Sequence, residues 1–369
     1  MNVLVIIGTR PEAIKMAPVV HALAATPDLA PVVCLTAQHR DMLDEVIEVF
    51  RLPVHHDLDL MRPGQSLTHV AVRVLEGVDR LLEEQSFGWV LVQGDTTTSL
   101  AAAQAAFHRR VRVGHVEAGL RTWNVREPFP EEWNRRAIDV LADLAFAPTE
   151  RARENLLSEH FPDERILVTG NTAIDALHWM LAQPAPSMPE ELADVDATRP
   201  LVLVTAHRRE SFGEPLDRVC RALAELAARD NGRGVSVVYP VHPNPNVKAS
   251  VARHLAGRPH VHLLPPVDYA RFVRLMQSAR LILTDSGGIQ EEAPGLGKPV
   301  LVLRERTERP EAIEAGTARL VGTDTAAIMA EVDRLLGDPV AYRAMAVARN
   351  PFGDGRAAGR IVEALRRPA

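Results

Sequence analysis

The sequence has few of the residues that mark secreted, membrane or zinc-binding proteins. Among 369 residues there are two cysteines, Cys34 and Cys220, and no CxxC pair, which disfavours disulfides and a structural zinc site. The chain opens on a short apolar run, residues 3–8, with no basic segment before it. That opening does not fit a signal peptide or a membrane span. These absences favour a cytoplasmic protein in a reducing compartment.

An excess of positive charge is also absent. The formal net charge is -6 at pH 7, so nothing in the charge favours a nucleic acid or a membrane surface as a partner. The only lysines are Lys15, Lys248 and Lys298, which makes a lysine inside a motif informative. An anionic ligand would therefore need a local basic site.

Short apolar runs alternate with longer segments of helical period, beginning with helices at residues 12–25 and 41–50. This alternation predicts parallel sheets covered by helices on both faces. The adjacent pair His55 and His56 is expected in a solvated loop. We expect strands at residues 3–8, 32–36, 89–93, 111–115, 144–147 and 166–169, and again at 201–205, 235–239, 261–264, 281–284, 299–303 and 319–321.

A proline-rich segment, residues 183–189, separates the two series of strands, because neither a helix nor a central strand persists through it. We predict an N-terminal Rossmann-like domain at 1–182 and a C-terminal Rossmann-like domain at 190–353. A terminal helix within 354–369 is expected to pack on the first domain. Such sheets bind ligands beyond the carboxyl ends of their strands, so we expect a cleft between the domains.

The turn after the first strand reads GTRPEAIK and has the composition of an anion site. It combines a glycine, a proline at the helix start and two cations, Arg10 and Lys15, beside backbone N–H groups. It is neither a GxGxxG fingerprint nor a Walker loop. The structural alternative is an ordinary turn with solvated cations.

A second candidate is the string TDSGGIQEE. Here Ser286 can cap a helix, Gly287 and Gly288 allow close backbone approach, and Glu292 can accept hydrogen bonds from ribose hydroxyls. The structural alternative is a plain serine cap followed by surface glutamates.

Carboxylates form a third group. Asp95 and Glu117 each follow a strand, and Glu131 opens a helix. Carboxylates gathered in one cleft repel one another, which raises one pKa and suits acid-base catalysis. Alternatively, Asp95 caps the next helix and Glu131 complements a helix N-terminus. His207 is expected to contact a pyrophosphate or to donate a proton, and no set of histidines has metal-ligand spacing.

With these strings assembled, the chain resembles the non-hydrolysing bacterial UDP-N-acetylglucosamine 2-epimerases. The resemblance covers nearly the whole length and implies a glycosyltransferase-B-like pair of domains, a homodimer, UDP-N-acetylglucosamine as substrate, and no cofactor or metal. The matching strings occur in family order: GTRPEAIK, GDTTTSLAAA, GHVEAGLRT, PEEWNRR, TGNTAIDAL, TAHRRESFG, HPNPNV, TDSGGIQEEAP and TERPEA.

The resemblance also implies roles for single residues. A second substrate molecule, which activates many members of the family, would contact Gln38 and His242. The acid-base groups it implies are Asp95, Glu117, Glu131 and His207. The substrate contacts it implies are Arg10, Lys15, Asp95, Glu117, His207, Phe272, Ser286, Gly287, Gly288, Glu292 and Arg309.

The chemistry of the reaction favours the same interpretation. The proton on sugar carbon 2 is not adjacent to a carbonyl group, so it must be activated before a base can remove it. One route oxidises carbon 3 with a nicotinamide, for which the chain shows no fingerprint. The other expels UDP and re-adds it to a glycal. A hydrolysing epimerase that releases N-acetylmannosamine and UDP, and a non-catalytic UDP-sugar sensor, are the alternatives.

Overall fold

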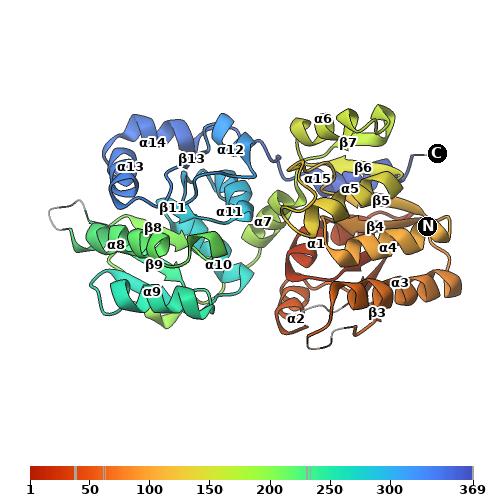
Figure 1. The fold of residues 1–369 in the computed structure, drawn as a ribbon, viewed down its shortest axis with the longest axis horizontal. Helices are drawn as coiled ribbons and strands as arrows, with labels where there is room; N and C mark the ends of the chain where they lie inside the picture. Colours follow the sequence, from red (N-terminus) through yellow and green to blue (C-terminus); the bar gives the residue numbers. More distant parts are fainter. Residues whose placement is uncertain (37–39, 61, 63, 230–231, 233, 368–369) are drawn as a thin grey trace. The chain divides into compact units, whose positions relative to one another are not determined.

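The computed structural model describes residues 1–36, 40–60, 62, 64–229, 232 and 234–367, and the chain forms two compact units (Figure 1). The N-terminal unit comprises Met1–Trp179 and Phe352–Ala369, and the C-terminal unit comprises Met180–Pro351. Each unit contains one sheet, of seven and six strands, in which the paired strands are parallel. The predicted fold class of two doubly wound parallel-sheet α/β domains is confirmed.

The sheet of the N-terminal unit has the order β3-β2-β1-β4-β5-β6-β7. Its strands are β1 (Asn2–Ile7), β2 (Ala30–Leu35), β3 (His56–Asp57), β4 (Trp89–Gln93), β5 (Arg112–Val116), β6 (Leu144–Ala147) and β7 (Ile166–Val168). Its helices are α1 (Arg10–Ala24), α2 (Arg40–Val49), α3 (Leu67–Glu84), α4 (Thr97–His108), α5 (Glu131–Leu141), α6 (Glu150–Ser158), the greater part of α7 (Thr172–Ala182), α15 (Ala357–Leu365) and the 3-10 turn η1 (Asp163–Arg165).

Helices cover both faces of this sheet. Leu4 and Ile6 of β1 pack in one apolar cluster with residues of α3 and α4, whereas the intervening Val3 and Val5 are fully buried on the other face. Helices α3, α4 and α5 pack in sequence beside one another, and α1 packs against α2 and α15 (Figure 1). Burial on both faces explains why the strands are almost uninterrupted apolar runs.

The expectation that His55 and His56 lie in a solvated loop is confirmed for His55, which is exposed and outside any strand, and is wrong for His56. His56 opens β3, which pairs in parallel with β2, and His55 Nδ1 accepts a hydrogen bond from the backbone N–H of Val33 at 3.0 Å. A strand of two residues is too short to show an apolar periodicity, which is why the sequence pattern did not predict it.

The sheet of the C-terminal unit has the order β10-β9-β8-β11-β12-β13. Its strands are β8 (Leu201–Thr205), β9 (Ser236–Pro240), β10 (Val261–Leu264), β11 (Leu281–Thr284), β12 (Val300–Val302) and β13 (Ala318–Leu320). Its helices are α8 (Glu214–Ala228), α9 (Pro245–Leu255), α10 (Tyr269–Ser278), α11 (Gly287–Glu292), α12 (Pro310–Glu314), α13 (Thr325–Gly337) and α14 (Pro339–Ala346), with the 3-10 turns η2 (Glu190–Leu192), η3 (Arg209–Ser211) and η4 (Ala293–Leu296).

The proline-rich segment 184–189 forms neither a helix nor a strand. It is tied to α10 of the C-terminal unit, because Arg271 Nε donates to the carbonyl of Ser187 at 2.9 Å and Arg274 donates to the carbonyl of Gln183 at 2.7 Å. None of the helices in the described ranges combines the length and the hydropathy that a bilayer crossing requires.

Strand order fixes where each sheet can bind a ligand. The order reverses between β1 and β4 in the first sheet and between β8 and β11 in the second. In open α/β sheets the crevice for ligands lies beyond the carboxyl ends of the strands at such a reversal. The turns after these four strands, together with the turn after β5, carry most of the motifs singled out by the sequence.

Candidate active site

The turn between β1 and α1 is held by a carboxylate of its own helix. Thr9 caps α1, and Glu12 accepts hydrogen bonds from the backbone N–H groups of Gly8 at 2.6 Å and Thr9 at 2.7 Å. Glu12 is buried, and burial raises the pKa of its carboxyl group above the ordinary value. These two backbone N–H groups are therefore occupied by Glu12 and are not available to the anionic ligand that the sequence predicts at this turn.

Lys15 binds a carboxylate and is not a solvated cation. Its Nζ lies 2.8 and 2.6 Å from the two carboxylate oxygens of Glu117, which follows β5. The side chains of Gln93 and Asn171 also donate to Glu117, the second at 3.2 Å. Glu117 is buried and its φ is +67°, a value that residues other than glycine rarely adopt. Its carboxylate is therefore fixed from several sides.

Asp95 follows β4 and faces a different cation. Arg135 Nη2 lies 2.7 Å from its carboxylate. Burial raises the pKa of Asp95 above its ordinary value; Arg135 opposes this rise, whereas the charges of Glu117 and Glu131 add to it. A raised pKa of this origin is typical of a general acid or base. The alternative that Asp95 caps α4 is wrong, because Thr96 provides that cap.

Helix α5 brings the remaining groups to Asp95. Glu131 opens the helix, Asn134 donates to the backbone carbonyl of Asp95 at 2.9 Å, and Arg135 follows Glu131 by one turn. Within the described part of the chain, Glu131 Oε2 is buried and has no hydrogen-bond partner. Leaving such an oxygen unpaired costs about 1–3 kcal/mol, so we expect a ligand to satisfy it.

In the C-terminal unit, His207 follows β8 and Asp285 follows the neighbouring β11. Asp285 is fully buried and accepts hydrogen bonds from the backbone N–H groups of His207 at 2.7 Å and Arg208 at 2.8 Å. Its Oδ1 lies 3.3 Å from His207 Nδ1. Burial lowers the pKa of His207 below its ordinary value, and Asp285 opposes that shift. His242 stacks on His207 with 5.3 Å between the ring centroids.

The helix start after Asp285 has room for a ligand. Ser286 occupies the cap position of α11, but its hydroxyl makes no capping hydrogen bond, so the interpretation as a plain serine cap is wrong. Gly287 and Gly288 do not have positive φ values, and an added Cβ would come no closer than 3.7 Å to its nearest neighbours, the side chains of Arg309 and Glu292. Nothing in the folded unit therefore requires glycine at these two positions.

The other expected contacts of this unit lie on α10, α11 and α12. Glu292 ends α11 and accepts a hydrogen bond from the Tyr269 hydroxyl at 2.9 Å. Arg309 precedes α12, and its Nε donates to Glu291. Phe272 lies in α10 and is half-buried.

The predicted residues thus fall into two groups. Lys15, Asp95, Glu117 and Glu131 meet in the N-terminal unit, with half-buried Arg10 at the start of α1. A second group belongs to the C-terminal unit: His207, His242, Phe272, Ser286, Gly287, Gly288, Glu292 and Arg309. Gln38 lies outside the described residues. Within the described ranges, no three His, Cys, Asp or Glu side chains gather as metal ligands would.

Sequence reasoning missed the residues that hold these groups. Arg135 stands four residues after Glu131, a helical spacing that could have been noticed. Asp285 stands in the TDSGG string but was not singled out. Gln93 and Asn171 give no local signal, because their role depends on contacts with Glu117 across the sheet.

Comparison with known proteins identifies the family of the chain. The profile of the family described as UDP-N-acetylglucosamine 2-epimerase matches residues 21–366. The UDP-N-acetylglucosamine 2-epimerase of Salmonella typhimurium is 55% identical over 372 residues, covering 99% of this chain and 98% of the relative. That of Escherichia coli strain K12 is 54% identical, with the same coverage.

Solved structures lead to the same family. The enzyme from Neisseria meningitidis bound to UDP-GlcNAc has a TM-score of 0.90 and 46% identity, and the alignment covers 99% of each chain. A protein from Listeria monocytogenes has a TM-score of 0.92 and 45% identity, with coverage of 99% of this chain and 95% of that one. The chain belongs to the UDP-N-acetylglucosamine 2-epimerase family, a family of isomerases.

Proposed function

We propose that this protein is a non-hydrolysing UDP-N-acetylglucosamine 2-epimerase that interconverts UDP-N-acetylglucosamine and UDP-N-acetylmannosamine. The observation that carries the proposal is the group of three carboxylates at the ends of β4 and β5 and the start of α5, in which burial and neighbouring charge raise the pKa of Asp95. A protein that only bound a UDP-sugar would have little reason to keep three acids together.

The reaction begins when the bond between sugar carbon 1 and the UDP oxygen breaks, with the electron pair leaving on UDP. Positive charge develops at carbon 1, which makes the proton on carbon 2 acidic enough for a carboxylate to remove. The electrons of that C–H bond form the carbon 1–carbon 2 double bond of a glycal. Protonation of carbon 2 on the opposite face and return of UDP to carbon 1 complete the inversion.

The surroundings of each residue indicate its part in this reaction. Asp95 and Glu131 exchange protons with carbon 2 from the two sides of the ring, and Glu117 is held by Lys15 as a fixed neighbouring charge that tunes Asp95. His207, Ser286 and Arg309 hold the departing UDP, assisted by Arg10, with Gly287 and Gly288 leaving space for its phosphates. Phe272 and Glu292 are assigned to the nucleoside.

Proton NMR in heavy water tests the proposal. Incubation with UDP-N-acetylglucosamine should leave the sugar nucleotide intact and replace the proton on carbon 2 by deuterium, with UDP-N-acetylmannosamine accumulating. Stoichiometric release of free UDP and N-acetylmannosamine would instead identify a hydrolysing enzyme. Binding without any exchange would identify a sensor.

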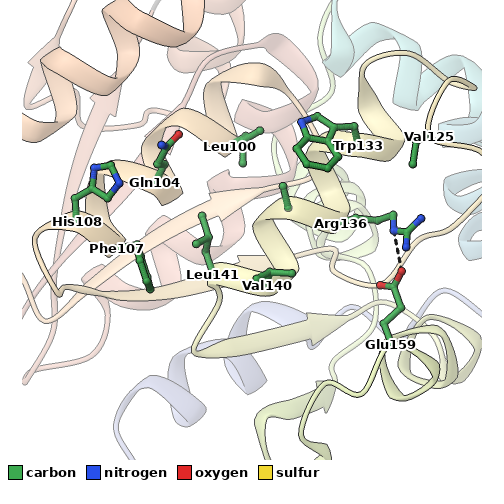
Figure 2. Close-up of a pocket in the computed structure, with 11 residues that line it drawn as sticks. Leu100, Gln104, Phe107, His108, Val125, Trp133, Arg136, Val140, Leu141 and Glu159 are labelled. Carbon is green, nitrogen blue, oxygen red and sulfur yellow. Dashed lines mark ion pairs between the residues drawn. The ribbon is translucent and has the colours of Figure 1, made fainter.

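We further propose that the protein forms a homodimer through α4 and α5. The N-terminal unit has a pocket of about 970 Å³. Figure 2 shows the side chains that line it, which include Phe107, Trp133 and Val140. These three are 57%, 57% and 84% exposed, respectively. An apolar face rimmed by the ion pair of Arg136 and Glu159 is typical of a subunit interface, and a second copy can cover it with the same face.

Sedimentation of a Val140→Asp variant tests the dimer. A charge buried at the centre of a symmetric interface is introduced twice, so the variant should sediment as a monomer while the unaltered chain sediments as a dimer. Val347→Asp is the matched control, because Val347 is 75% exposed in the other unit. Two variants that sediment alike would contradict the assignment of this face.

A further inference from the structure

His115 is fully buried in β5, two residues before Glu117, and it has no direct part in the proposed reaction. Its Nε2 lies 2.7 Å from the backbone carbonyl oxygen of Gly94, and its Nδ1 lies 2.6 Å from Oδ1 of Asp139 in α5. A carbonyl oxygen can only accept a hydrogen bond, so Nε2 must carry a proton. What remains is whether Nδ1 carries one as well.

The surroundings of Asp139 answer that question. Its second oxygen, Oδ2, accepts a hydrogen bond from Arg121 Nη2 at 2.6 Å, an arrangement that favours an ionised carboxylate. Burial acts to raise the pKa of Asp139, and the charge and hydrogen bond of Arg121 oppose that rise independently of His115. An ionised Asp139 has no proton to donate, so Nδ1 of His115 must be the donor.

The contact with Gly94 connects the buried ring of His115 to the backbone of Asp95. Gly94 has a φ of +67°, and its N–H donates to the carbonyl of Val116 at 2.9 Å. The carbonyl that His115 binds belongs to the peptide group whose nitrogen is that of Asp95. Because a peptide group is planar, fixing this carbonyl also fixes the backbone from which the Asp95 carboxylate projects.

We propose that His115 is a positioning residue with a proton on each ring nitrogen, whose Nε2–H holds the Gly94 carbonyl and thereby sets the Asp95 carboxylate against Arg135 and Glu131. Asp139 accepts the hydrogen bond from Nδ1, and it extends from α5, the helix that also carries those two residues. The inference rests on the proposed function, because Asp95 is a catalytic group only in that reaction.

Two near-isosteric variants separate the two hydrogen bonds of the ring. Gln in place of His115 can still donate from the position of Nε2 to Gly94 but loses Asp139, whereas Asn can still donate from the position of Nδ1 to Asp139 but loses Gly94. Both remove the ring and its charge, so a purely structural role would affect them alike. Melting temperature, the KM for UDP-N-acetylglucosamine and the rate of deuterium exchange at carbon 2 are measured for both.

We expect His115→Gln to keep the exchange rate within about threefold of the unaltered enzyme, and His115→Asn to slow it by roughly 10- to 100-fold, the effect of misplacing a catalytic group by about 1 Å. The KM values and melting temperatures of the two variants should agree. Equal exchange rates, or a faster Asn variant, would overturn the proposal.

Neutron diffraction from the unaltered protein provides a readout that needs neither variant to fold. Deuterium density on both ring nitrogens of His115 is expected, and density on one nitrogen alone would overturn the proposal. An unaltered protein that exchanges no deuterium at carbon 2 would overturn the proposed function and with it the positioning of a catalytic Asp95. The neutron map would then still decide the charge on the ring by itself.

Discussion

Ion pairs in the two units place the acid and the basic group in opposite order of exposure. In the N-terminal unit the Asp95 side chain is 27% exposed, whereas its partner Arg135 is 10% exposed. In the C-terminal unit the basic groups are outermost, since the His207 side chain is 37% exposed over a fully buried Asp285, and Arg309 is 15% exposed over Glu291 at 1%. Lys15, at 18%, likewise covers Glu117, at 5%. Asp95 is therefore the acid that the first unit exposes, whereas the C-terminal unit exposes basic groups.

The order of exposure within an ion pair has a physical consequence for its acid and for its basic group. A cation behind an acid limits how far burial raises the pKa of that acid, which keeps it able to both accept and donate a proton. An acid behind a basic side chain fixes its direction and, at His207, opposes the fall in pKa that burial causes. The following substitutions test the comparison, from the largest expected effect to the smallest.

Replacing Asp95 by Asn should remove proton transfer and leave the anion half intact. We expect the rate of deuterium exchange at carbon 2 to fall by about 100- to 10,000-fold, the usual contribution of a general acid or base. The Kd for UDP, measured by calorimetry, should change by less than about threefold, because most of its proposed contacts lie in the other unit and Asp95 is not among them. An exchange rate close to that of the parent would remove Asp95 from the mechanism.

Replacing Gly288 by Ala should weaken UDP binding and leave proton transfer intact. An added Cβ meets its nearest neighbour, Glu292, at 3.7 Å, so the variant should fold with an unchanged melting temperature. A methyl group in the space of a ligand costs about 1–3 kcal/mol, and we expect UDP to bind roughly 10- to 200-fold more weakly. Gly337→Ala is the matched control in the same unit, since nothing lies within 4 Å of its added Cβ. Equal affinities would show that the glycines are not ligand contacts.

Replacing Arg135 by Gln removes the cation behind the acid. Burial already raises the pKa of Asp95 and Arg135 opposes the rise, so the pKa should move further up in the variant. Asp95 can accept a proton only when it is ionised, that is, at pH values above its pKa. A higher pKa should therefore move the acidic limb of the pH profile for kcat to higher pH. The rate at pH 6 relative to pH 8 measures the shift. A displacement toward lower pH would contradict the pairing seen here.

Replacing Asp285 by Asn removes the acid behind His207. Burial lowers the pKa of His207 and Asp285 opposes that effect, so the pKa should fall further in the variant. The protonated ring then disappears at lower pH, and the alkaline limb of UDP affinity should move in that direction. Loss of charged hydrogen bonds to the backbone should lower the free energy of unfolding by about 1.5–3 kcal/mol. Calorimetry across pH and urea denaturation measure the two effects.

The strands and the candidate positions could be predicted from the sequence because their signals are local. An apolar run predicts β4, and the polar residues directly after it predict where a ligand meets the sheet. The pairing of these residues could not be predicted, since Lys15 and Glu117 stand 102 residues apart. Only the register of β1, β4 and β5 decides that this lysine meets this glutamate.

Two of the differences between expectation and structure share one cause. Glu12 occupies the backbone N–H groups of Gly8 and Thr9, and Ser286 does not provide the cap that is its structural alternative. Both residue types are compatible with more than one hydrogen-bonding arrangement. Backbone donors near a helix start can be satisfied by any acceptor within reach, and the sequence does not show which acceptor arrives.

The departure and return of UDP is the central claim, and positional isotope exchange tests it most directly. UDP-N-acetylglucosamine is labelled with oxygen-18 in the bridge between sugar carbon 1 and the β-phosphorus, incubated with the enzyme, re-isolated and analysed by phosphorus NMR. If UDP leaves, rotation of its terminal phosphate makes the oxygens equivalent and label should appear in the non-bridging positions. Label that stays in the bridge while carbon 2 gains deuterium would contradict the account.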